Sequence, residues 1–272
     1  SITTLILGSN FEKEIDLSYL VKLKNLTVNG MLVQINLPLS IEELYLKYLS
    51  RYLDLSYLVN LNKLIIRDYT EKLILPYNLK HLDITYYNNA KLVTLPDNLE
   101  TLRLCSEYNY PLNNLPSGLI TLTIDGKFNQ PICNLPARLQ KLSLIKEFNQ
   151  PVDSLPIGLL KLHILHSNFN QSLDCLPPGL QELHLSVSED IRLDNLLNTL
   201  KQLHIYNDVN NNSLDMLPES IEKLSIRHYT RKINKLPLNL KDIMVNKDYK
   251  YVDDLKLLKP IEDYEKIKDL DI

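Results

Sequence analysis

Glycine, alanine and tryptophan are scarce in this chain, and their scarcity narrows the functions it can have. The sequence has six glycines, no tryptophan, and alanine only at Ala90 and Ala137. Loops that hold nucleotide phosphates are rich in glycine, and no such loop is visible. No apolar run approaches the roughly 18 residues of a transmembrane helix, and the first residues carry no signal-peptide pattern. We therefore expect no membrane partner.

Cysteine is scarce too. Cys105, Cys133 and Cys175 are an odd number and show no C-x-x-C spacing, which argues against a disulfide framework and against a zinc ribbon. Unpaired thiols are typical of a reducing compartment, so the sequence predicts a cytoplasmic protein.

The chain has no strong excess of charge of either sign. Lysine and arginine number 30 against 33 aspartates and glutamates, which gives a formal net charge of -3. A nucleic-acid-binding protein usually carries a basic surface, so we expect no nucleic-acid partner. With 272 residues, the chain is long enough for two globular domains or one elongated array.

An internal repeat favours one elongated array over two globular domains. A Leu-x-Leu/Ile tripeptide recurs every 18 to 21 residues in thirteen copies, the last with isoleucine first. The first members are Leu5, Leu26, Leu44, Leu64, Leu82, Leu102, Leu122, Leu142, Leu162, Leu183, Leu203, Leu224 and Ile243. Such a period is typical of a leucine-rich-repeat solenoid. We predict a mostly β member of the α/β repeat class, with about 13 coils of about 20 residues and a parallel concave sheet.

Each coil carries further signals between its strands. Leu-Pro-x-x-Leu precedes most strands, as at 115–119, and proline there favours an extended or 3₁₀ convex side. Two turns, 17–23 and 55–61, lack the proline and fit a short helical turn.

Phe-Asn-Gln-Pro follows some strands, as at 128–131, and its aromatic side chain would fill the space between coils. Its asparagine belongs to a column that we interpret as a structural ladder satisfying the backbone of the bend: Asn89, Asn109, Asn129, Asn149, Asn170 and Asn211.

The string from Phe128 to Leu144 resembles the FNIP repeat, a leucine-rich-repeat variant abundant in social amoebae and in giant DNA viruses that infect amoebae. The full motif covers about residues 108–185. In that family the repeats often follow an F-box that tethers the protein to a ubiquitin ligase, but no F-box is visible in these residues. The resemblance implies an interaction module that recruits substrates to a ubiquitin ligase adaptor, in the host cytoplasm if the protein is viral. The Leu-Pro skeleton is also similar to the repeats of bacterial effector proteins, which lack the Phe-Asn-Gln-Pro half.

The two ends of the array differ. We assign residues 1–256 to the solenoid and 257–272 to a capping segment, because Ile261, Tyr264, Ile267 and Leu270 form an apolar stripe typical of a helix. The alternative is a disordered charged tail. The first strand shows no cap, so it could be covered by a partner or pair with a second copy, and we expect a monomer or an edge-paired dimer.

Residues between the leucines should face away from the core and line the concave face. There we expect a binding surface for a protein partner made by Tyr45, Arg103, Lys141, Lys161, His163, Glu182, His184, His204, Tyr206 and Arg227. His163, His184 and His204 share one column on three successive strands. A metal site is one reading, but strand spacing of about 4.8 Å is wide for ring nitrogens that must converge on one ion, so we predict no metal and no other cofactor. A binding region without metal, or simple surface polarity, are the other readings.

No catalytic motif is recognisable, so we predict a protein that is not an enzyme. The favoured function is a module for protein–protein interaction. The alternative is a structural protein that associates with itself through its N-terminal edge.

Overall fold

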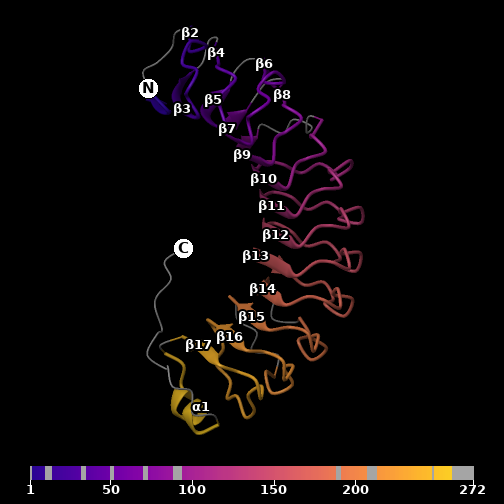
Figure 1. Cartoon of the computed structure of the whole chain (residues 1–272). Helices are drawn as coiled ribbons and strands as arrows, with labels where there is room; N and C mark the ends of the chain where they lie inside the picture. The colour runs from indigo at the N-terminus through magenta and orange to yellow at the C-terminus, as the bar shows by residue number, and fades with distance from the viewer. Residues whose placement is uncertain are drawn as a thin grey trace. The chain divides into compact units, whose positions relative to one another are not determined.

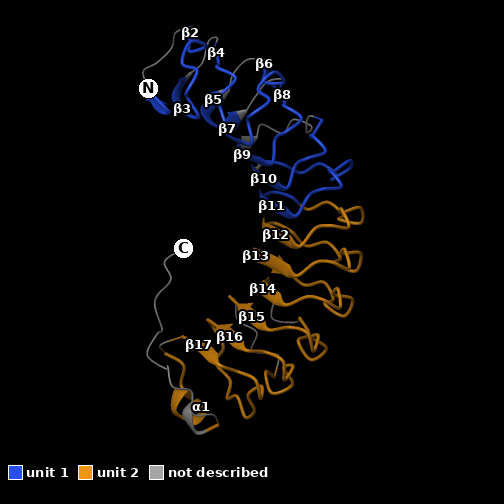
Figure 2. Ribbon diagram, viewed as in Figure 1, with its two compact units in different colours: residues 1–128 blue, residues 129–272 orange. Residues whose placement is uncertain are grey.

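A computed structural model describes residues 2–9, 14–31, 35–49, 52–69, 73–87, 94–187, 191–206, 213–246 and 248–258 (Figure 1). The chain divides into two compact units, residues 1–128 and residues 129–272 (Figure 2). Both are stacks of short coils, and each is described by itself below.

The first unit contains seven parallel strands that pair in chain order. They are β1 (Thr4–Leu7), β3 (Asn25–Met31), β5 (Glu43–Leu49), β7 (Lys63–Tyr69), β9 (His81–Tyr87), β10 (Thr101–Ser106) and β11 (Thr121–Gly126). Two small sheets lie on the other side of the first coils, pairing β2 (Ile15–Asp16) with β4 (Ile35–Asn36) and β6 (Leu53–Asp54) with β8 (Leu73–Ile74). In the main sheet the first leucine of each tripeptide pairs with the first leucine of the next, as Leu102 does with Leu122.

The second unit continues the same pattern with six parallel strands. They are β12 (Lys141–Lys146), β13 (Lys161–Phe169), β14 (Glu182–Val187), β15 (Gln202–Ile205), β16 (Lys223–Ile226) and β17 (Asp242–Val245). The pairing of β13 with β14 shifts register between Ile164 and Phe169. All thirteen predicted tripeptides are therefore strands, seven in one unit and six in the other, and the predicted parallel solenoid is confirmed.

The core of each unit consists of the leucines that the repeat supplies. In β12 the side chains of Leu142 and Leu144 are 0% exposed, and Leu162 and Ile164 are equally buried in β13. Burying a leucine side chain contributes about 1.5–3 kcal/mol relative to leaving it in water. A single coil could not bury this surface alone, so each coil is stabilised by its neighbours.

The Leu-Pro-x-x-Leu segments close tight turns opposite the sheet. The backbone N–H of Leu119 donates to the carbonyl of Pro116 at 3.1 Å, and Leu139 bonds to Pro136 in the same way. These are i→i+3 hydrogen bonds, the 3₁₀ pattern expected for this side. In the proline-free turn at 17–23, two such bonds follow one another and no α-helix forms.

Aromatic side chains fill the gaps between coils. Phe148 and Phe169 are buried and stack with ring centroids 6.3 Å apart. In the first unit Tyr108 and Phe128 stack at 6.2 Å. The stacks place one large apolar side chain per coil at the bend after the strand.

The asparagine column joins successive bends within the second unit. Oδ1 of Asn129 accepts from the backbone N–H of Asn149 at 2.9 Å, and Oδ1 of Asn149 accepts from that of Asn170 at 3.1 Å. Nε2 of Gln171 also donates to Oδ1 of Asn149. Asn109 occupies the same repeat position in the first unit, whereas Asn89 and Asn211 lie outside the described residues.

A second amide column was not predicted. Nδ2 of Asn60, Asn78 and Asn98 donates to the backbone carbonyl of Leu39, Val59 and Tyr77, respectively, at 2.8–3.2 Å. Each bond joins a turn to the turn of the preceding coil. These bonds satisfy backbone carbonyl groups of the turns.

The ends of the chain are described in part. Helix α1 (Val252–Leu258) begins before the predicted boundary at 257 and buries Leu255 completely. The predicted capping residues 259–272 lie outside the described residues. No helix in the described ranges has the length and apolar character needed to cross a bilayer.

At the other end, β1 pairs with β3 and with no other described strand. Ile2 and Ile6 are 51% and 66% exposed. Pairing of this edge with a second copy remains a prediction.

Removing one amide from the asparagine column tests its role. Asn149→Ala leaves the N–H of Asn170 without its acceptor and removes one of the two acceptors of Gln171 Nε2, so the free energy of unfolding should fall by about 1 kcal/mol. Asn149→Asp keeps the accepting oxygen and should lose less. Urea unfolding followed by circular dichroism gives both values, and an alanine variant as stable as the wild type would contradict the structural role.

Candidate functional site: a histidine ladder

Three histidines lie in one row on the sheet face of the second unit. His163 on β13 pairs in register with His184 on β14, which pairs with His204 on β15. The His163 and His184 rings stack with centroids 4.1 Å apart and planes inclined by 25°. The His204 ring follows at 4.1 Å and 36°. We call His163, His184 and His204 the histidine ladder.

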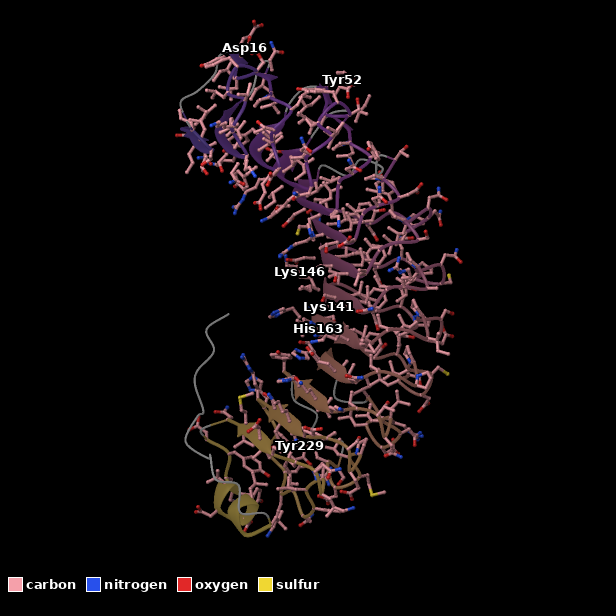
Figure 3. The ribbon with its side chains drawn as sticks, viewed as in Figure 1. Asp16, Tyr52, Lys141, Lys146, His163 and Tyr229 are labelled. Atoms are coloured by element: carbon pink, nitrogen blue, oxygen red, sulfur yellow. The ribbon has the colours of Figure 1, made fainter. Side chains whose placement is uncertain are left out.

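The predicted neighbours Lys141, Lys161 and Glu182 surround the ladder. Lys141 and His163 project from the same side of β12 and β13 (Figure 3). Oε2 of Glu182 accepts from Nζ of Lys161 at 2.7 Å. Oε1 of the same carboxylate lies 2.8 Å from Nε2 of His163 and 3.2 Å from Nε2 of His184. The same carboxylate oxygen therefore hydrogen-bonds to His163 and lies close to His184.

The other ring nitrogens have hydroxyl partners. Nδ1 of His163 lies 3.4 Å from Oγ of Ser143, and Nδ1 of His184 lies 3.2 Å from the hydroxyl of Tyr206. The guanidinium of Arg227 stands 5.1 Å over the Tyr206 ring, in a cation–π contact. A hydroxyl can donate or accept, so Ser143 and Tyr206 are compatible with either state of Nδ1. The ionised Glu182 can only accept, so its bond to His163 places the ring proton of that residue on Nε2.

Nε2 of His184 is the exception in this network. It is buried and finds no hydrogen-bond partner among the described residues. Although Oε1 of Glu182 is only 3.2 Å away, the two atoms lack the alignment that a hydrogen bond needs.

Burial keeps the ladder neutral. Desolvation lowers the pKa of His163 and of His204, and Glu182 only partly opposes this. The pKa of His184 falls to about 3, because its ring is buried and lies between two other imidazoles. Burial alone would raise the pKa of Glu182, but Lys161 and His163 outweigh it and bring this pKa to about 2. An ionised carboxylate thus faces neutral rings at pH 7.

The smallest residues of the outward column are less accessible than the sequence suggests. Ser143 and Ser225 project from the sheet face, but they are 4% and 9% exposed. Their short side chains are covered by larger neighbours, as Ser143 is by His163. Both serines face away from the leucine core, as the alternation predicts, but larger side chains cover them.

The remaining predicted binding residues lie in the first unit, so they are described apart from the ladder. Tyr45 on β5 receives the guanidinium of Arg67 at 5.7 Å. Arg103 on β10 donates from Nε to Sγ of Cys105 at 3.3 Å and lies 3.9 Å from Oδ2 of Asp125. Arg103 and Cys105 are two residues apart on β10 and so share one side of the strand, but no motif in the sequence indicates a bond between them.

Comparisons with known proteins give few likenesses. No model of a protein family matches the chain, and no curated protein matches it significantly. Solved structures similar to 91% of the chain, each at 18% identity, include the circular leucine-rich-repeat protein CroV588, with a TM-score of 0.49. An internalin, InlF, of Listeria monocytogenes has a TM-score of 0.47, and YopM of Yersinia enterocolitica has 0.30. The chain spans 57% of CroV588, 82% of the internalin and 85% of YopM. The leucine-rich-repeat fold of this chain is established by its own period and strand register.

The ladder should make the stability of the chain depend on pH. Since the histidine pKa values in the folded chain lie below their usual value of 6.5, the unfolded chain binds more protons below that pH. The melting temperature should therefore fall between pH 7 and pH 5, before Glu182 titrates. His184→Gln should reduce this fall.

Exposed His228 provides the matched control. His228→Gln should keep the wild-type dependence on pH. Melting followed by circular dichroism at pH 7, 6 and 5 measures all three proteins. Equal slopes for the wild type and His184→Gln would show that the ladder is not held neutral by burial.

Proposed function

We propose that this protein is a non-catalytic module for protein–protein interaction, and that it binds its partner on the sheet face of residues 129–272. The observation that supports this most is the row made by the histidine ladder, Tyr206 and Arg227 on neighbouring strands. These side chains are half-buried against one another, so they present a fixed surface.

The composition of this row suits a protein partner. Tyrosine and arginine are enriched among the residues that dominate binding energy, and rigid aromatic side chains lose little entropy on binding. The surrounding charges have both signs, with Lys161 paired to Glu182 and Lys223 lying 3.9 Å from Asp242. A mixed polar rim around a less polar centre is the usual anatomy of a protein interface.

The resemblance to FNIP repeats extends the proposal to a class of partner. On this resemblance, the partner is a substrate of a ubiquitin ligase, and this chain is the part of the ligase adaptor that recognises it. The binding takes place in the cytoplasm of a cell or of an infected host. Self-association through the β1 edge is the alternative. The expected absence of catalysis, nucleic acid and membrane binding belongs to the same proposal.

A pair of matched variants tests the binding face. The triple variant His163→Ala, His184→Ala, His204→Ala removes the ladder, whereas Arg138→Ala, Asp153→Ala, Asp194→Ala changes three exposed residues of the turns. Proteins captured from amoeba lysate by the wild type are then produced in pure form, and their dissociation constants are measured with each variant. We expect the ladder variant to bind at least tenfold more weakly, and the turn variant to bind like the wild type.

Size-exclusion chromatography with light scattering accompanies the binding assay. Partners bound equally well by the ladder variant would refute the proposed face. A concentration-dependent dimer that Ile6→Lys on β1 dissociates, together with no purified partner, would favour the self-associating alternative.

A further inference from the structure

Three metal-ligating atoms converge on the sheet face of the second unit. They are one ring nitrogen each of His163 and His184 and a carboxylate oxygen of Glu182, and they lie within 4.8 Å of one another. Nε2 is the nitrogen of each ring that lies close to Oε1 of Glu182. They come from β13 and β14, two hydrogen-bonded strands, so the backbone holds their relative positions. Two imidazoles and one carboxylate form a common three-residue set for a divalent transition metal.

One of these donors is unused. Nε2 of His184 is buried and makes no hydrogen bond to any described residue. A buried polar atom without a partner costs free energy, and such an atom in a native site calls for an explanation. An ion between the rings and Glu182 would give this nitrogen a partner.

The surroundings of the donors match those of a metal site. Imidazoles that bind a metal through Nε2 usually donate the Nδ1 proton to a second group, which fixes the ring. Ser143 and Tyr206 stand at Nδ1 of His163 and His184, respectively. Glu182 can bind an ion through Oε1 while Oε2 keeps its bond from Lys161. For His163, this requires the ring proton to move from Nε2 to Nδ1, where Oγ of Ser143 can accept it.

The present arrangement is close to a coordination shell but not identical to one. In a tetrahedral site with bonds of about 2.1 Å, neighbouring donors are roughly 3.4 Å apart. The two distances to Oε1 of Glu182, 2.8 and 3.2 Å, are near that value. The His163 and His184 rings are inclined by only 25°, so their Nε2 lone pairs are nearly parallel. The rings must rotate until both lone pairs point at one ion. Rotation about the bond to the ring is soft in histidine and can supply this movement.

We propose that His163, Glu182 and His184 form a binding site for a divalent transition metal ion of the zinc class, with Tyr206 and Ser143 positioning the two imidazoles. The site binds through two nitrogens and one oxygen and leaves one coordination position open to water or to a donor from a partner. Metal binding does not depend on the protein–protein interaction proposed above.

Calorimetric titration with ZnCl₂ at pH 7.5 tests the site. Cys133 and Cys175 are exposed thiols that could bind zinc, so all proteins carry Cys133→Ser and Cys175→Ser. We expect one ion per chain and a higher melting temperature with zinc. His163→Gln, His184→Gln and Glu182→Gln should each weaken binding at least tenfold. Tyr206→Phe, which removes only the hydroxyl, should weaken it about tenfold.

His204→Gln is the matched control. His204 belongs to the same ladder but not to the three-donor set, so its variant should bind zinc within about threefold of the wild type. Circular dichroism without metal confirms that each variant is folded. Co²⁺ adds an independent readout, because four-coordinate Co²⁺ gives strong visible absorption bands that Glu182→Gln should abolish.

Absence of saturable Zn²⁺ or Co²⁺ binding would overturn the proposal, as would equal losses in His204→Gln and His184→Gln. A protein partner that binds equally well with and without chelator would leave the proposed interaction function intact whatever the result with zinc.

Discussion

Burial of one leucine pair per coil is the interaction on which the rest of the structure depends. Because side chains alternate along a strand, burying both leucines of each Leu-x-Leu tripeptide turns the residue between them away from the core. Each tripeptide then pairs in register with the next, as Leu183 does with Leu203. Any sequence that satisfied this constraint would display one column of side chains at a regular spacing.

The histidine ladder is a direct consequence of that spacing. Stacked parallel strands bring the ring centroids to 4.1 Å, close enough for burial and mutual repulsion to disfavour protonation. Neutral rings can bind a partner or a metal ion, whereas charged rings would repel one another. Glu182 offsets the unfavourable burial by accepting from His163 while it binds Lys161. The same register that builds the core thus determines the electrostatics of the face.

Most of the fold could be predicted from the sequence because it depends on a period of about 20 residues. The strands, the turns after Pro116 and its equivalents, and the buried aromatics all repeat at fixed positions, so each copy supports the others. The capping segment could not be located in this way, since it does not repeat, and α1 begins at Val252.

The site was predictable as a row of residues but not as a network. The sequence placed His163, His184 and Glu182 beside one another, yet contacts depend on rotamers that no period determines. Side-chain packing between coils brings one Glu182 oxygen close to two imidazoles. The same packing buries Ser143. The expectation of no metal rested on strand spacing alone, whereas the side chains bring three possible ligand atoms within 4.8 Å of one another.

Thiol reactivity along β13 tests the alternation of inward and outward side chains most directly. Single cysteines are placed at Lys161, Leu162, His163 and Ile164 in a chain that carries Cys133→Ser and Cys175→Ser, and their reaction with a soluble disulfide reagent is timed. Alternation predicts fast reaction at 161, slower reaction at 163, where neighbours partly cover a short side chain, and reaction at 162 and 164 at least tenfold slower than at 161. Equal rates at all four positions, or faster reaction at 162 and 164, would contradict it.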